Sequence, residues 1–167
     1  MVELIITNDL KGDLGETIFE HFSIQNQFAY AKTEEIYREL QAYNVLERTL
    51  IFRFDRERLK VKIPGLVEQE IRKYAVPSGY IGNDPSKPAF VVDYLTIHRA
   101  YALRKEENPP NCFQWAEIKT GDSQLTPNQE RIKKETKLEF YVMRFNLPPL
   151  DNIKMINMER YRNGKKI

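Results

Sequence analysis

The chain has 167 residues, of which 41% are hydrophobic and 30% are charged. This length and composition are those of a single globular domain with a sizeable core. No run approaches the ~18 apolar residues of a membrane helix, and the N-terminus lacks the layout of a signal peptide, so we expect no membrane association and a cytoplasmic, intracellular location. One cysteine, Cys112, excludes an internal disulfide and a cysteine-rich zinc site, and two histidines argue against a histidine-based zinc centre.

The net charge of +2 is too small to indicate nucleic-acid binding by itself. Basic residues do cluster at positions 131–137 and 160–166. These clusters fit phosphate contacts and an ordinary solvated surface equally well.

The first half of the chain is dominated by helix signals. Asp13 is expected to cap a helix, with Glu16 three residues later as in a capping box. Thr33 is expected to cap a second helix that runs to about Glu47. Two strand-like runs and a third helix follow, at residues 50–54, at residues 59–63 and from Pro64 onward.

The second half of the chain alternates strands and turns. A loop is expected at 77–88, which holds two glycines, three prolines and an Asn-Asp pair. The sequence Thr126-Pro127-Asn128-Gln129 is typical of a helix start, with a capping threonine and a glutamine that reaches back. Strands are predicted at residues 90–97, 113–119, 138–145 and 153–158.

These elements predict a hairpin, a crossover helix and a further strand. A strand–helix–strand crossover is right-handed and places the strands around Glu117 and Tyr141 parallel in one sheet. The expected fold is therefore α/β, with a central mixed β-sheet flanked by helices.

The densest chemistry lies on the strand at 113–119. Side chains on a strand alternate between its two faces, so Glu117 and Lys119 point the same way. A carboxylate beside an ammonium group suits a site that holds a divalent metal next to a phosphate.

Together these features resemble the PD-(D/E)XK nuclease superfamily. The family signature is an acid on an N-terminal helix, a strand that opens with Pro-Asp, Glu-x-Lys on the next strand, and a helix beyond it. The segments 117–121 and 125–129 look most like the Holliday-junction-resolvase-like and VRR-NUC-like branches. The resemblance implies one nuclease-like domain over 1–167 with a restriction-endonuclease-like core at about 10–25 and 78–158, and a helical and hairpin insertion at about 30–76.

The resemblance also implies roles for individual residues. Glu117 matches the acidic ligand of Mg²⁺ or Mn²⁺, with the backbone carbonyl of Ile118 completing the metal's oxygen ligands. Lys119 matches the lysine that positions the attacking water and balances charge in the transition state. Glu16 matches the acid of the first helix, although a capping-box role explains it too, and Glu20 is a weaker substitute.

On the helix after the strand, Gln129 matches a glutamine that approaches the active site in several branches. Its capping role explains it at least as well. Lys133 and Lys134 are candidate contacts to the phosphate backbone, with a solvated helix face as the simpler explanation.

Ala89 stands where the family has an aspartate after proline, and an alanine cannot bind a metal. The acid has moved to Asp93, or position 89 carries an engineered Asp→Ala change, or the chain is a naturally inactive relative. Four strand residues span about 13 Å, so positions 89 and 93 cannot serve one metal in the same hairpin register. A hairpin with Glu117 opposite Asp93 and one with Lys119 opposite Ala89 are equally compatible with the sequence.

The expected activity is hydrolysis of DNA phosphodiester bonds by a metal-activated water. Cutting both strands of a duplex or a junction requires two active sites, which predicts a homodimer. Two alternatives remain: a non-catalytic nucleic-acid-binding module of the same fold, and a plain α/β interaction domain whose Glu-x-Lys is surface decoration.

Overall fold

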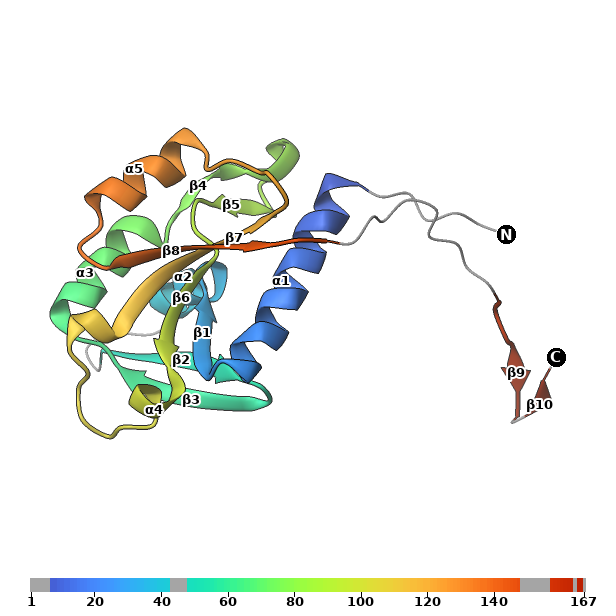
Figure 1. The fold of residues 1–167 in the computed structure, drawn as a ribbon, viewed down its shortest axis with the longest axis horizontal. Coiled ribbons are helices and arrows are strands. Elements are labelled where there is room, and N and C mark those ends of the chain that lie inside the picture. The colour runs from blue at the N-terminus through green and yellow to red at the C-terminus, as the bar shows by residue number, and fades with distance from the viewer. Residues whose placement is uncertain (1–6, 43–47, 148–156, 164, 167) are drawn as a thin grey trace.

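The computed structural model describes residues 7–42, 48–147, 157–163 and 165–166. Its centre is a six-stranded sheet, in which every neighbouring pair is antiparallel except the parallel pair β7–β8 (Figure 1). Across the sheet the strands are β3 (Glu57–Lys62), β2 (Thr49–Phe54), β1 (Phe28–Lys32), β6 (Tyr94–His98), β7 (Phe113–Thr120) and β8 (Glu139–Phe145). The α/β class with a mixed central sheet is confirmed.

Helices flank the sheet and connect its strands. The main helices are α1 (Asn8–Gln25), α2 (Thr33–Ala42), α3 (Gly65–Tyr74) and α5 (Pro127–Glu135), and the shorter pieces are α4 (Arg99–Ala102), η2 (Ile81–Asn83) and η3 (Pro110–Cys112). Two small hairpins complete the described chain: β4 (Pro77–Tyr80) with β5 (Pro88–Phe90), and β9 (Tyr161–Arg162) with β10 (Lys165–Lys166). Strands β7 and β8, which α5 connects, are parallel as expected.

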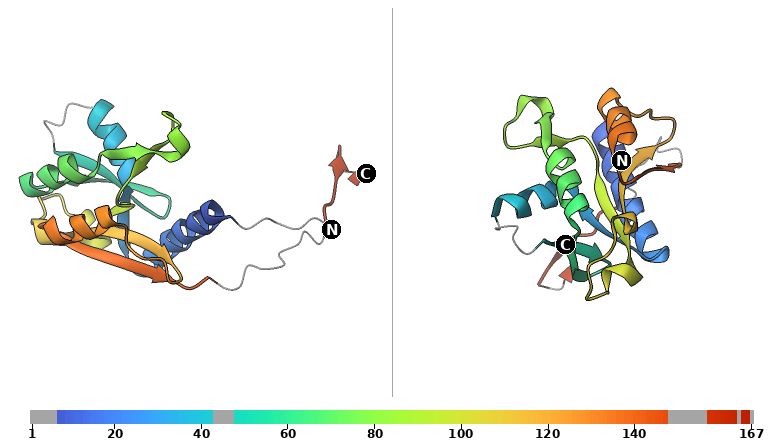
Figure 2. Two further views of the ribbon diagram at one scale, coloured as in Figure 1. Left: turned by 90° about the horizontal axis from the view of Figure 1, so that it is seen from above. Right: turned by 90° about the vertical axis from the view of Figure 1, so that its left-hand side faces the viewer.

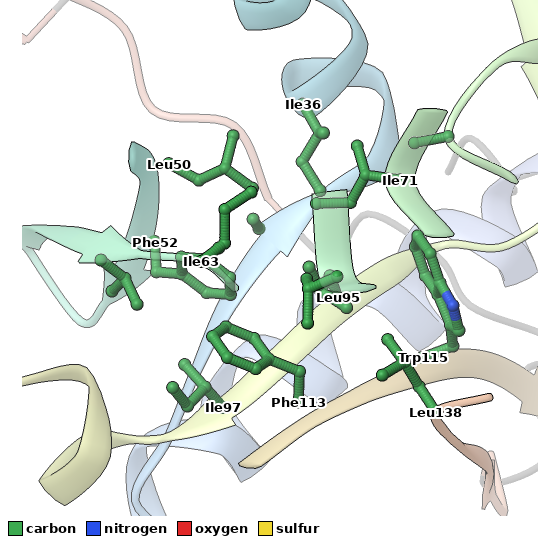
Figure 3. Packing of buried hydrophobic residues seen from close by; sticks show 14 of the residues in the cluster. Ile36, Leu50, Phe52, Ile63, Ile71, Leu95, Ile97, Phe113, Trp115 and Leu138 are labelled. Carbon is green, nitrogen blue, oxygen red and sulfur yellow. The ribbon is translucent and has the colours of Figure 1, made fainter. Parts of the chain in front are cut away.

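The two faces of the sheet bury different sets of side chains. On one face, Ile36 of α2 and Ile71 of α3 join Leu95 and Trp115 in the larger core (Figure 3). On the other face, Phe19 of α1 packs with the aromatic and apolar residues that alternate with those strand residues, namely Tyr30, Tyr94, Ala116 and Ile118. The strand period of two therefore separates the α1 face from the face covered by α2, α3 and α5.

The helix starts differ in how well the sequence predicts them. Thr126 caps α5 through its side chain, and the Gln129 side chain reaches back in a capping box, which confirms that prediction. The expected cap at Asp13 is wrong, because α1 begins after Thr7, whose hydroxyl accepts a hydrogen bond from Leu10 N. Glu16 therefore lies inside α1 and does not cap it.

The expected strand at 90–97 is divided in two. Its first part, β5, leaves the main sheet and pairs with β4, and β6 begins only at Tyr94. The expected loop at 77–88 consequently holds β4 and the start of β5. The strand expected at 153–158 lies mostly outside the described residues.

Residues 30–76 contribute to the central sheet. They contain β2, β3 and most of β1, and β1 pairs with both β2 and β6. Strand β1 was not predicted, and it joins the segment to the strands that carry the candidate site.

Helix α1 approaches β7 closely at a glycine, which gives a test of this packing. A Cβ on Gly15 would lie 2.8 Å from Thr120 Cγ2, whereas a Cβ on Gly12 would meet nothing within 4 Å. We expect Gly12→Ala to stabilise the fold by up to about 1 kcal/mol, since alanine favours a helix. Gly15→Ala should be less stable than Gly12→Ala by at least about 1 kcal/mol, because the added methyl overpacks the contact. Urea unfolding of both variants measures this difference, and equal stabilities would contradict the close approach.

Candidate active site

The candidate site lies where β6 begins and β7 continues past it. The last β6–β7 pair in this direction is Tyr94 with Ala116, so the next positions, Asp93 and Glu117, face each other. Strand β5 pairs with β4 and not with β7. The backbone at the end of β7 is therefore free on the β6 side, and there Ile118 N donates to the Asp93 side chain. The register therefore selects Asp93 as the acid beside Glu117.

The backbone at Asp93 is fixed by the first residue of α2. Thr33 N donates a 3.0 Å hydrogen bond to Asp93 O, and the Thr33 hydroxyl also donates to Asp93 O and to Val92 O. Thr33 is almost fully buried. Sequence analysis identified Thr33 only as a helix cap, because Asp93, which accepts its hydrogen bond, is sixty residues away.

Asp93 and Glu117 hold each other through reciprocal backbone contacts. Asp93 N donates to Glu117 Oε2 at 3.1 Å, and Ile118 N donates to Asp93 Oδ2 at 2.8 Å. Glu117 is only 4% exposed, so its carboxyl group is held in a fixed position within the domain.

Gln129 connects the site to helix α5. Its amide nitrogen donates to Glu117 Oε1 at 2.8 Å and to the carbonyl of Val91 at 2.9 Å. Its amide oxygen accepts from Thr126 N at 3.0 Å within the capping box. The Gln129 side chain therefore closes the capping box and contacts Glu117 at the same time. It fixes Glu117 relative to the start of α5.

Lys119 completes the cluster on this face of β7. Its Nζ lies 3.7 Å from Glu117 Oε1, and its side chain is 14% exposed. An ammonium group at this distance and burial partly offsets the carboxylate charge while remaining accessible to a ligand.

Burial raises the pKa of each acid at the site, and the charge of Asp93 adds to the rise at Glu117. For Glu117, burial raises the pKa most, followed by the charge of Asp93, and Lys119 opposes both. For Asp93, burial raises the pKa, and the hydrogen bond from Ile118 N opposes it most strongly. Two neighbouring carboxyl groups, one buried and one half-buried, are stable when they share a proton or when a cation lies beside them.

Glu16 lies at the margin of this pair. Burial raises its pKa, with the charge of Asp93 as the next cause, so the two carboxylates act on each other. Lys32, the last residue of β1, reaches across to α1 with its Nζ 3.9 Å from Glu16 Oε2 and 3.6 Å from Glu20 Oε1. Sequence analysis missed Lys32, because nothing local indicated that β1 ends beside α1.

The remaining candidates lie away from the carboxyl pair. Ala89 is on β5 opposite Gly79, in the two-stranded sheet, and not on the strand that pairs with β7. Lys133 and Lys134 are exposed on α5, and Lys133 forms an ion pair with Glu130 at 3.1 Å. The structure thus brings together Asp93, Glu117, Lys119, Gln129 and the Ile118 backbone, with Glu16 nearby.

The donor set is made of hard oxygen atoms. Among the described residues, no group of three or more His, Cys, Asp and Glu side chains is placed to hold a metal ion. Two neighbouring carboxyl groups with raised pKa values favour a nearby cation, and carboxylate oxygens are the ligands that Mg²⁺ and Mn²⁺ prefer. The pair therefore fits a divalent cation of this type chemically.

Comparison of the chain with protein-family models, with curated proteins and with solved structures finds no match. Within the described residues, no helix has the length and apolar character needed to cross a membrane.

Proposed function

We propose that this chain hydrolyses phosphodiester bonds in DNA, with Mg²⁺ or Mn²⁺ bound at the Asp93–Glu117 pair. The observation that carries the proposal is the pairing of Asp93 with the buried Glu117 carboxyl group through hydrogen bonds from Asp93 N and Ile118 N, with Lys119 beside Glu117. A bound divalent cation would lower the pKa of an attacking water and offset the charge that develops on the phosphate.

The chain's own residues would divide the remaining work. Glu117 and Asp93 supply carboxylate oxygens, and Thr33 and Gln129 hold them in place. The Ile118 carbonyl is a third oxygen donor, since N–H and C=O of one strand residue point to the same edge and Ile118 N points at Asp93. Lys119 would hold the scissile phosphate and offset its negative charge.

The order of elements supports the resemblance to the PD-(D/E)XK nucleases. An acid on helix α1 is followed by an aspartate directly before β6, by Glu-x-Lys on β7 and by helix α5 beyond. Helix α1 packs against β7, and Gln129 of α5 contacts Glu117. The restriction-endonuclease-like core is on this basis our proposal for α1, β1, β6, β7, α5 and β8.

The choice of DNA as substrate and of a dimer as the working form follows the same resemblance. A phosphate contact carries no sequence information, so elements outside the carboxyl pair must select the DNA structure. A symmetric dimer would present two sites, one for each strand of a duplex or junction.

The test is cleavage of radiolabelled duplex and four-way-junction DNA with Mg²⁺, with Mn²⁺ and with EDTA. We expect products only with metal, and loss of products in Asp93→Asn. If the chain binds DNA without metal but cleaves it neither with Mg²⁺ nor with Mn²⁺, the protein is instead the non-catalytic binding module.

A second prediction concerns position 89. We expect Ala89→Asp to leave cleavage unchanged within about twofold, because residue 89 lies on β5 and Asp93 already occupies the place beside Glu117. The parent chain and the variant are compared in the same cleavage assay. Activity that appears only in the variant would show that position 89, and not position 93, supplies the missing acid.

A further inference from the structure

A basic hollow lies at the opposite end of the domain from the candidate active site. It has a volume of about 400 Å³ and lies between the end strand β3 and the segment that follows α4. The β4–β5 hairpin and the start of α5 mark the active-site end, whereas α4 and β3 lie at the other end (Figure 1; Figure 2, right). Every charged residue that lines the hollow is a cation: Arg58, Lys60, Lys62, Arg104 and Lys105.

Among the described residues, most of these cations form no ion pair with an acid, although the charge of Arg58 acts on the Glu39 carboxyl group. Arg104 forms an ion pair with Glu106 at 3.4 Å. In the part of the chain that the structure describes, Arg58, Lys60, Lys62 and Lys105 form no ion pair. This contrasts with the basic residues on the main helices, which are mostly paired, as in Arg38 with Glu34.

Strand geometry arranges three of these cations in a row. Arg58, Lys60 and Lys62 alternate along β3 and are exposed, whereas Val61 between them is buried. Alternate residues of a strand share one face and are about 7 Å apart. Lysines on an end strand also discourage edge-to-edge aggregation, but that role does not require a hollow or the cations of a second segment.

We propose that this basic hollow binds the phosphate backbone of nucleic acid, as a second contact surface outside the carboxyl pair. A linear row of unpaired cations matches a linear polyanion, because each phosphate neutralised by Lys or Arg releases condensed counterions. The choice of nucleic acid among polyanions rests on the proposed function.

The distance between the two surfaces sets the length of substrate that can reach both. Strand β6 separates Asp93 from α4, and its five residues span about 17 Å. Phosphates along one strand of a duplex advance about 3.4 Å each, so an arm that reaches the hollow must extend at least about five nucleotides from the carboxyl pair. Shorter arms leave the hollow empty.

The experiment compares two triple variants of the full chain by fluorescence anisotropy with labelled duplex DNA, in EDTA and at several salt concentrations. The test variant is R58Q/K60Q/K62Q. The control is R38Q/R72Q/K73Q, whose cations are each paired with a glutamate. Both variants change the net charge equally, from +2 to −1 after loss of three positive charges. Circular dichroism and gel filtration are used to check that both variants are folded and unaggregated.

We expect the test variant to bind at least about tenfold more weakly than the parent at about 0.1 M salt. The slope of log K against log salt should fall by about 2 to 3, since each phosphate contact contributes about 0.9. The control should stay close to the parent in slope. Equal affinities and slopes for the two variants would overturn the inference, as would binding of the parent to anionic phospholipid vesicles but not to DNA.

Hydrogen exchange gives an independent readout on the unaltered chain. Added duplex should protect residues 57–62 and 99–105, and protection confined to other segments would overturn the inference. These measurements need no metal and no cleavage. If the nuclease proposal is wrong, DNA binds through the hollow but no metal-dependent products form. If the hollow does not bind DNA, metal-dependent cleavage still occurs.

Discussion

Replacing Glu117 by glutamine is expected to lower metal-dependent DNA cleavage by at least about 100-fold. An amide keeps the shape of the side chain but cannot supply the charge that attracts a divalent cation. Isothermal titration with Mn²⁺ should show the corresponding loss of metal binding, and the cleavage assay should show the loss of products.

The same variant turns one of the two acceptors that face Asp93 N and Gln129 Nε2 into a donor, but we expect it to lose less stability than the matched variant Glu70→Gln at about pH 8 in EDTA. Burial and the neighbouring Asp93 both disfavour the charge of Glu117, so removal of that charge relieves a cost that the metal-free fold bears. A variant that loses activity while it remains folded at the assay temperature separates a functional role of Glu117 from a structural one.

A second buried glutamate provides the matched control. Glu70 on α3 accepts hydrogen bonds from the Thr136 hydroxyl at 2.7 Å and from Lys137 N at 2.8 Å. In Glu70→Gln one of these acceptors becomes a donor, and we expect a loss of about 1–3 kcal/mol of stability. Cleavage should persist at temperatures where the variant is folded. The proposal fails if Glu117→Gln cleaves like the parent or if Glu70→Gln alone abolishes cleavage.

The sequence predicted best those elements whose signals are local. The capping box at Thr126 and Gln129 is contained in four residues, and the structure has it as expected. The parallel pairing of β7 and β8 also follows locally, because a single helix connects the two strands.

The elements that the sequence did not predict depend on distant partners. Strand β1 has two alanines among its five residues and gains its place from β2 and β6 on either side. The division of the expected strand at 90–97 depends on β4, which withdraws β5 into a separate hairpin. Tertiary pairing overrides local propensity in both places.

The candidate site combines the two situations. Glu117 and Lys119 could be assigned to one face from their spacing alone, and the structure agrees. The partner acid could not be assigned, since the hairpin register decides between positions 89 and 93 and the register depends on the whole sheet. Thr33 contacts Asp93 across about sixty residues of chain, and Lys32 reaches Glu16 on α1 from the end of β1; no local pattern indicated either contact.

The stability of the metal-free protein is expected to fall as the pH rises from about 6 to about 8. The pKa of Glu117 in the folded chain is raised to about 9, and the pKa values of Asp93 and Glu16 are raised as well. The folded state then holds protons that the unfolded state has already lost. Stability therefore decreases with pH in the window between the unfolded and folded pKa values, by at most about 1.4 kcal/mol per pH unit for each proton.

A divalent cation should reverse this trend. Metal binds the ionised carboxylates, so its affinity rises as these protons leave, and binding stabilises the folded state by mass action. Thermal unfolding in EDTA and in Mn²⁺ across this pH range measures both effects. We expect the two melting curves to separate as the pH increases, and we expect Glu117→Gln to flatten the EDTA curve. A gap of constant size between the EDTA and Mn²⁺ curves of the parent would mean that the metal binds away from these carboxyl groups, whose protons it should displace.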